Sequence, residues 1–421
     1  MTNLSHKFAA GTNDQLAPDP VEIAPVPRIT IHAYFETSEM AGAMESAAAD
    51  RRMSRAHVSV RSGGVAAATE TYRQAPTPNL LLLEVPAQYP TLLADIDALA
   101  SVCAPETKLI VFGRTNDVAL YRDLLERGVS EYLLAPVDVL TIIGVVSRLY
   151  HEAGTKKLGR ICAFIGAKGG VGSSTIAHNV AATLAYQYEA DVMLADMDFA
   201  FGTADLNFNL IPSQGIADAV KDSKRLDETL LDRLLTPCRE HLGLLAAPSM
   251  LDETCDFAEG TFEQMLEIAQ AHVPFTVLDL PHVWTSWVKK TLVAADQVVI
   301  TSTPDLASLR AAKSLVTLLK QARPNDAPPK LVLNQVGMRK RPEIKPADFA
   351  KALELEPIST IRFDPQIFGA AANKGQMICD VAPRSDIVSA FEQLAEAVAG
   401  RKEAKRQVTG FASLLKRLGK W

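Results

Sequence analysis

A glycine-rich turn separates an apolar run from a segment with helical character in ICAFIGAKGGVGSST, residues 161–175. Its glycines, Gly169, Gly170 and Gly172, can adopt positive φ, so the backbone N–H groups can converge on an anion. A helix that begins directly after such a turn adds the positive end of its dipole. The segment therefore predicts a phosphate-binding loop and, with it, a nucleotide site.

Two positions of this loop depart from the usual pattern G-x-x-x-x-G-K-[ST]. Ala167 replaces the first glycine, and Ser173 replaces the lysine that holds the phosphates. A cation is still present, because Lys168 precedes the glycine pair and can supply charge from the other side of the loop. Ser174 aligns with the hydroxyl that binds Mg²⁺, and Thr175 is expected near the α-phosphate.

Acidic and amide side chains end three other apolar runs. Asp196 and Asp198 follow DVMLA, Asp279 follows FTVL, and Asn334 ends the run KLVLN. The carboxyl ends of parallel strands meet at one edge of a sheet, so these groups are expected beside the loop. Asp279 fits a Walker B carboxylate that holds Mg²⁺ through water, and Asp196 fits the outer shell of the ion. The alternatives are a solvated strand end for the Asp196 and Asp198 pair, and a turn residue for Asn334.

The early lysine makes the loop resemble the deviant Walker A motif, K-G-G-x-G-K-[ST], of the MinD/ParA family of dimeric P-loop ATPases. This resemblance implies that Lys168 reaches across a dimer to the partner's nucleotide and that Asp198 positions or activates the attacking water. It implies ATP and Mg²⁺ as cofactors, with Asn334 at the adenine edge and Pro365 near the base. The expected nucleotide contacts are Gly169, Gly170, Val171, Gly172, Ser173, Ser174, Thr175, Asn334 and Pro365, and the expected metal ligands are Ser174, Asp279 and Asp196.

The loss of the second lysine at Ser173 bears on turnover more than on binding. Phosphoryl transfer is catalysed by positioning and charge neutralisation, so a missing cation costs orders of magnitude in rate unless Lys168 of a second subunit replaces it. We expect ATP binding with slow, dimer-dependent hydrolysis or with none.

Residues 28–150 alternate short apolar strands with helical patterns, which predicts an α/β domain with a parallel sheet. Their order resembles a response-regulator receiver domain. At the positions of the receiver's acidic pair, phosphoacceptor, hydroxyl and lysine this chain has Phe35-Glu36, Glu84, Gly113 and Ala135. The phosphorylation chemistry is thus missing, and the domain is interpreted as a pseudo-receiver used for interaction. Glu84 is either a mimic of a phosphorylated aspartate or an ordinary residue at a strand end.

The predicted fold class is α/β, with two doubly wound parallel-sheet domains. Residues 1–27 are predicted to be a disordered leader, 28–150 the pseudo-receiver, 151–158 a linker, and 159–400 the MinD/ParA-like P-loop domain. The hydrophobic content of 48% suffices for two cores. Five cysteines without metal-ligand spacing, and no signal-peptide or membrane-spanning apolar run, favour a cytoplasmic protein.

The C-terminal segment, residues 401–421, differs in charge from the rest of the chain. It holds seven Lys or Arg and one acid, so it carries +6 while the remainder carries −12. Apolar and basic residues of 405–421 segregate to opposite sides at 100° per residue. This pattern is typical of a helix in an anionic membrane interface, as in the C-terminal helix of MinD proteins, and also fits docking onto the protein's own domain or a partner.

A pseudo-receiver joined to a P-loop domain with KGGVGSST resembles the CpaE/TadZ family, which positions the type IVb (Tad/Flp) pilus machinery at a cell pole. The resemblance implies an ATP-dependent homodimer at the inner membrane that meets secretion components and a polar localisation factor, with no specific nucleic acid. Two alternatives remain: a MinD/ParA-type ATPase for division or DNA positioning, and a nucleotide-independent signalling scaffold with a vestigial P-loop. DNA binding requires a basic surface, which the −12 remainder disfavours.

Overall fold

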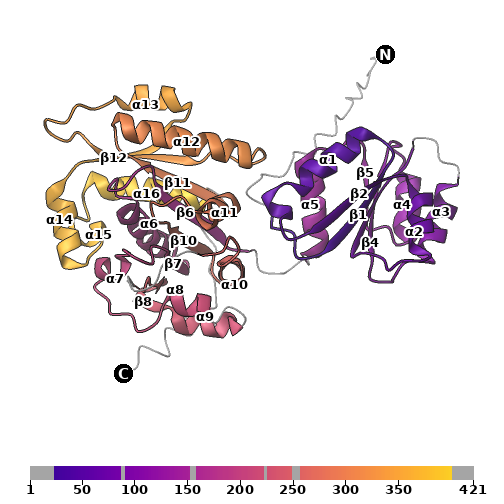
Figure 1. Cartoon of the computed structure of the whole chain (residues 1–421), viewed down its shortest axis with the longest axis horizontal. Helices are drawn as coiled ribbons and strands as arrows, with labels where there is room; N and C mark the ends of the chain where they lie inside the picture. Colours follow the sequence, from indigo (N-terminus) through magenta and orange to yellow (C-terminus); the bar gives the residue numbers. More distant parts are fainter. Residues whose placement is uncertain (1–22, 87–90, 152–157, 222–224, 249–256, 401–421) are drawn as a thin grey trace, which may run out of the picture. The chain divides into compact units, whose positions relative to one another are not determined.

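The computed structural model describes residues 23–86, 91–151, 158–221, 225–248 and 257–400. The chain divides into two compact units between Thr155 and Lys156 (Figure 1). The predicted leader as far as residue 22 and the basic segment 401–421 lie outside the described residues.

The N-terminal unit is a five-stranded parallel sheet in the order β2-β1-β3-β4-β5. This 2-1-3-4-5 order is a doubly wound topology, and helices cover both faces (Figure 1). The strands are β1 (Thr30–Phe35), β2 (His57–Ser62), β3 (Leu80–Glu84), β4 (Lys108–Gly113) and β5 (Glu131–Leu134). The helices are α1 (Ser38–Ala48), α2 (Val65–Tyr72), α3 (Leu92–Ala100), α4 (Val118–Glu126) and α5 (Val139–Tyr150), with a 3₁₀ turn, η2, at Arg51–Met53.

The uninterrupted apolar run of β3 serves two cores. Leu80 and Leu82 pack with α1 and α5, whereas Leu81 and Leu83 pack with α2 and α3 on the other face. Strands buried on both faces give such continuous apolar runs, which are the short apolar strands that the sequence of residues 28–150 predicted. Ile23 and Val26 also pack into the α1 and α5 core, so the predicted end of the leader at residue 27 is wrong.

The second unit is an eight-stranded sheet in the order β13-β12-β11-β6-β10-β7-β9-β8, parallel except for β8. Its strands are β6 (Arg160–Gly166), β7 (Val192–Asp196), β8 (Thr236–Arg239), β9 (Leu242–Leu245), β10 (Phe275–Asp279), β11 (Gln297–Ser302), β12 (Lys330–Val336) and β13 (Pro357–Arg362). Its helices are α6 (Ser173–Tyr188), α7 (Ala204–Asn207), α8 (Ile216–Lys221), α9 (Glu228–Leu234), α10 (Glu263–His272), α11 (Ser286–Ala294), α12 (Leu306–Ala322), α13 (Pro346–Leu353), α14 (Pro365–Lys374), α15 (Ile378–Val381) and α16 (Asp386–Ala399).

Alternate residues of the central strand β6 again separate two cores. Ile161, Ala163 and Ile165 pack with α10, α11 and α12, while Cys162 and Phe164 pack with α6 and α16. The predicted fold class is confirmed, since both units are α/β with parallel, doubly wound sheets. Within the described ranges, no helix is long and apolar enough to cross a membrane.

Candidate functional site

The loop between β6 and α6 has the backbone that a phosphate cradle requires. Gly170 has φ 78° and Gly172, the N-cap of α6, has φ 86°. A side chain at Gly172 would also place its Cβ 2.6 Å from Asn334 Nδ2. The prediction of positive φ for all three glycines is wrong at Gly169, which does not adopt positive φ. An added Cβ there would meet only His282 Cδ2, at 3.9 Å.

The end of β12 is fastened to this loop. Asn334 Nδ2 donates to Val171 O at 2.8 Å, and Gln335 Nε2 donates to Gly170 O at 3.0 Å. Asn334 is buried, and its Oδ1 accepts the backbone N–H of Gln335. Its amide therefore braces the loop, whereas the resemblance had implied contact with the adenine edge.

The predicted acids of β7 and β10 are neighbours. Asp196 and Asp279 are cross-strand partners in the parallel register and are both buried. Burial, and then the charge of Asp279, raises the pKa of Asp196 to about 6. Asp196 accepts the backbone N–H groups of Asp198 and Ala204 at 3.1 and 3.0 Å. Asp198 is partly exposed and caps its own turn by accepting from Phe201 N.

Two buried oxygen atoms beside the loop have no hydrogen-bond partner: Asp279 Oδ1 and Ser173 Oγ. An unpaired buried carboxylate oxygen is costly and is a ready ligand for a hard cation such as Mg²⁺. Asp196, Asp279 and His178 bring ligand atoms within 4.8 Å of one another. The donor set therefore fits a divalent cation, with Asp279 as the available ligand and Ser174 in the first turn of α6.

Lys168 is held within its own chain. Its Nζ lies 2.9 Å from Asp305 Oδ2. Asp305 is also the N-cap of α12, accepting from Ser308 N. Burial acts to raise the pKa of Asp305, but hydrogen bonds from Thr303, Ser308 and Lys168 outweigh it and lower the pKa below its usual value. The predicted signature lysine thus has a carboxylate partner in the monomer.

Other predicted residues are placed less centrally. Thr175 lies in the first turn of α6, where its carbonyl accepts from Asn179 Nδ2. Pro365 lies at the exposed first position of α14, which packs against α7 and α15.

The sequence interpretation missed His178, which is hydrogen-bonded to Asp279. The available signal was its position four residues after Ser174, on the same face of the helix.

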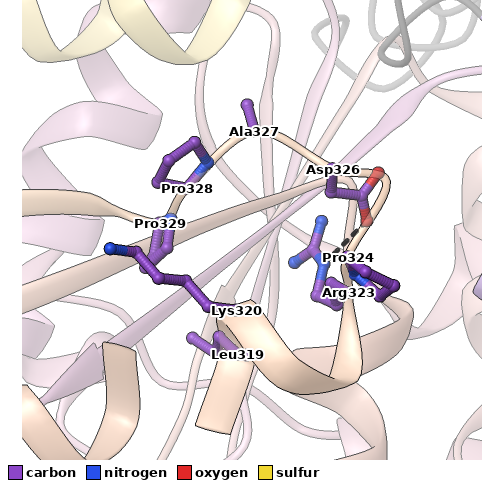
Figure 2. A pocket seen from close by; sticks show the side chains of 8 residues that line it. All are labelled: Leu319, Lys320, Arg323, Pro324, Asp326, Ala327, Pro328 and Pro329. Atoms are coloured by element: carbon purple, nitrogen blue, oxygen red, sulfur yellow. Dashed lines mark hydrogen bonds and ion pairs between the residues drawn. The ribbon is translucent and has the colours of Figure 1, made fainter. Parts of the chain in front are cut away.

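A cavity of about 290 Å³ lies elsewhere in this unit (Figure 2). It is formed by the end of α12 and the turn before β12, with Pro328 and Pro329 on one side. The Arg323 guanidinium is bonded to Asp326 at 2.8 Å. Because β12 starts at Lys330 and reaches the P-loop only at its carboxyl end, this cavity lies at the opposite edge of the sheet.

Comparisons with known proteins agree with the fold of the second unit. A family model described as an AAA domain matches residues 159–331. A ParA family ATPase from Chlorobium tepidum is 26% identical over 56% of this chain and 98% of that one, with a TM-score of 0.52. The septum site-determining protein MinD from Pyrococcus horikoshii, solved with Mg-ADP, is 18% identical over 60% of this chain and 100% of that one, with a TM-score of 0.53, and shows the shared fold.

The pilus assembly protein CpaE from Caulobacter crescentus is 50% identical to this chain. The match covers 31% of this chain and 98% of that structure, with a TM-score of 0.30. The chain belongs to the CpaE/TadZ family, with a MinD/ParA-like domain, as its motifs predicted.

Proposed function

We propose that this protein binds ATP with Mg²⁺, forms an ATP-dependent homodimer, and helps to localise and assemble a type IVb pilus machinery at the inner membrane or cell pole. The observation that carries the nucleotide part is the pair of unpartnered buried oxygens, Asp279 Oδ1 and Ser173 Oγ, beside a glycine loop with two positive-φ residues. The pilus assignment is transferred from the similar Caulobacter protein.

Each group at this edge has a role in the proposal. The loop N–H groups and the start of α6 bind the phosphates, and Asp279 with Ser174 holds Mg²⁺, which neutralises phosphate charge. Asp198 orients the attacking water, Asp196 supports the metal site, Asn334 braces the loop through Val171 O, and Pro365 lies toward the base. With Ser173 in place of a lysine, hydrolysis is slow or absent.

Exposed apolar side chains support a second copy of this chain as the partner. Phe201, Trp284 and Leu306 follow β7, β10 and β11, so all three come from the carboxyl edge that carries the P-loop, and they are 71%, 53% and 74% exposed. Large apolar side chains at a common edge mark an interaction surface. A dimer across this edge would cover them and bring Lys168 of one subunit to the nucleotide of the other.

The test is equilibrium binding of a fluorescent ATP analogue with and without Mg²⁺, with the mass measured by light scattering in the same samples. We expect Mg²⁺-dependent binding and a doubled mass in the wild type, and binding without the mass change in Lys168→Ala. Lys289→Ala on the exposed surface of α11 is the matched control. Absence of binding in the wild type would favour the alternative of a nucleotide-independent scaffold.

Membrane and cellular roles have their own test. Residues 405–421 lie outside the described residues, and the proposal assigns them to an anionic membrane surface. Flotation with anionic vesicles should depend on these residues and weaken with salt. In cells, deletion of the gene should displace or abolish pili, and normal pilus number and placement would contradict the pilus role.

A further inference from the structure

His178 is a fully buried imidazole whose two nitrogens both have partners. It lies on α6, and its Nε2 is 3.1 Å from Asp279 Oδ2. Its Nδ1 is 2.9 Å from Asn207 Nδ2, on the short helix α7. None of the roles assigned above uses this side chain, although it contacts the carboxylate expected to hold Mg²⁺.

The contacts define the direction of the hydrogen bonds. An amide nitrogen such as Asn207 Nδ2 only donates, so His178 Nδ1 accepts and Nε2 carries the proton. Nε2–H therefore donates to Asp279 Oδ2. This fixes the carboxylate with one oxygen occupied and leaves Oδ1 as the buried oxygen without a partner. His178 thus selects which Asp279 oxygen is available to a cation.

Helix α7 is tied to the acidic pair by a second, separate contact. Asp196 Oδ2 accepts the backbone N–H of Ala204, the first residue of α7, at 3.0 Å. The ring of Phe208, the residue after α7, lies 6.0 Å from the imidazole of His178. Leu206 of α7 and Ile211 just beyond it are 66% and 99% exposed. Both carboxylates are therefore in contact, directly or through His178, with a short helix beside exposed apolar side chains.

We propose that His178 is a positioning residue that orients Asp279 toward the cation and couples the cation site to α7. The inference rests on the proposed binding of Mg²⁺ and nucleotide. When Asp279 Oδ1 binds a cation, the carboxylate is fixed, and the chain Asp279–His178–Asn207 holds α7 in place. Cation binding thereby orders the segment 203–209 and presents its exposed side chains in one arrangement.

The first experiment separates cation binding from nucleotide binding. Mn²⁺ affinity in the presence of ADP would be measured by electron paramagnetic resonance for the wild type, His178→Leu and His178→Gln. We expect about a 10- to 100-fold weaker Mn²⁺ affinity in His178→Leu, the usual effect of removing a partner that orients a metal ligand. The loss should be smaller in His178→Gln, whose amide can still donate to Asp279. ADP affinity in EDTA should be unchanged in both.

The second experiment follows α7 directly. Hydrogen exchange of residues 203–209 should slow on addition of Mg²⁺ and nucleotide in the wild type. It should be insensitive to them in His178→Leu and in Asn207→Leu, which removes the far end of the chain of contacts. His241→Asn is the matched control, because it removes another His–Asp contact of the same unit, His241 Nδ1 to Asp191 Oδ1 at 2.7 Å, before the amino ends of β9 and β7.

The outcomes discriminate between explanations. Equal losses of ADP affinity with and without a divalent cation would make His178 merely structural and overturn the proposal. A directly bound nitrogen detected in the Mn²⁺ spin-echo spectrum would overturn it in favour of a metal ligand. If hydrogen exchange of residues 203–209 in the wild type does not change with Mg²⁺ although Mn²⁺ binds, the coupling to α7 alone is refuted. If the wild type binds neither cation nor nucleotide, both this inference and the proposed function are overturned. His178→Gln keeps the test valid if His178→Leu fails to fold.

Discussion

The carboxyl edges of the two parallel sheets each present a buried acid, and the two acids are treated differently. Glu84 ends β3 and Asp279 ends β10, and each is 2% exposed. Glu84 accepts from Glu36 N at 3.0 Å, Thr37 N at 2.9 Å and Thr37 Oγ1 at 2.8 Å, and Arg114 lies 3.6 Å away. Asp279 has one oxygen on His178 and the other without a partner.

This difference shows that topology places an acid at a functional edge, whereas the partners of that acid decide its use. The Glu84 carboxylate is saturated by the loop after β1 and so holds that loop in place. Asp279 Oδ1, by contrast, has no hydrogen-bond partner and is available to a cation. Two sheets of the same doubly wound class therefore have a closed edge at Glu84, where the acid is fully hydrogen-bonded, and an open edge at Asp279, where one acid oxygen has no partner.

The largest effect is expected at the open edge, from Ser173→Lys. The new ammonium would supply the phosphate-binding charge that the loop lacks, so ATP turnover should rise about 10³-fold, or about 4 kcal/mol in the barrier. Steady-state phosphate release measures this, with Ser314→Lys on exposed α12 as the control. An unchanged rate would show that Lys168 of a second subunit already supplies the charge.

The open edge should also make stability depend on pH. The pKa of Asp196 is raised from 3.8 to about 6, so the folded state binds its proton more tightly than the unfolded state does. This contribution to the free energy of unfolding is fully present below about pH 4. It is lost as the pH rises through 6, which lowers the free energy of unfolding by roughly 3 kcal/mol. Chemical denaturation between pH 4 and 7 measures it.

Two variations sharpen that result. Asp279→Asn removes the neighbouring charge, so its stability should fall less across the same pH window. Added Mg²⁺ should stabilise the wild type more at pH 7 than at pH 4.5, because a cation favours the ionised acids. Parallel curves for the wild type and Asp279→Asn would contradict the coupling of the two acids.

A smaller loss is expected at the closed edge, from Glu84→Gln. The amide places an NH₂ group against backbone donors that now face a carboxylate, which should cost about 1–3 kcal/mol of unfolding free energy. Urea denaturation of the N-terminal unit's transition measures it. Glu70→Gln, in an exposed pair with Arg73 on α2, should change little. Nucleotide binding should be the same in both variants, and a loss in Glu84→Gln would contradict the assignment of this edge to structure.

The smallest effect on stability is expected from Asp305→Asn. The ion pair with Lys168 is partly exposed to solvent on both sides and asparagine keeps the α12 cap, so the unfolding free energy should change by less than about 1 kcal/mol. Release of Lys168 should instead strengthen ATP-linked dimerisation by up to about fivefold in light scattering. Glu263→Gln, which removes a similar exposed pair with Lys290, should leave dimerisation unchanged.

The sequence predicted the central strands and the edge strand β5, and missed three of the four edge strands. β3, β6 and β10 are buried on both faces, and their apolar runs are unmistakable. β2 reads HVSVRS, β13 reads PISTIR and β8 is the antiparallel TPCR, because an edge strand needs only part of its surface to be apolar. These three strands were not predicted.

The same limit applies to the site. The P-loop and the neighbouring acids could be predicted because their backbone requirements and strand ends leave a local pattern. His178 leaves only its spacing of four residues from Ser174 as a local signal, because its contact with Asp279 spans 101 residues. The Lys168–Asp305 pair leaves no local signal, because its two residues are 137 positions apart. The bracing role of Asn334 was missed for the same reason, since one strand's last amide and another strand's loop meet only in the folded sheet.

The contact between Gly172 and Asn334 restricts how this loop can be redesigned. Glycine is required at position 172 by its backbone angle and again by the amide only 2.6 Å from an added Cβ. Shortening residue 334 would open the space but would leave the angle unfavourable and the Val171 carbonyl without its donor. A combinatorial library at positions 172 and 334 should therefore recover the parental pair rather than new combinations, and loops transplanted from other nucleotide-binding proteins will need the end of β12 transferred with them.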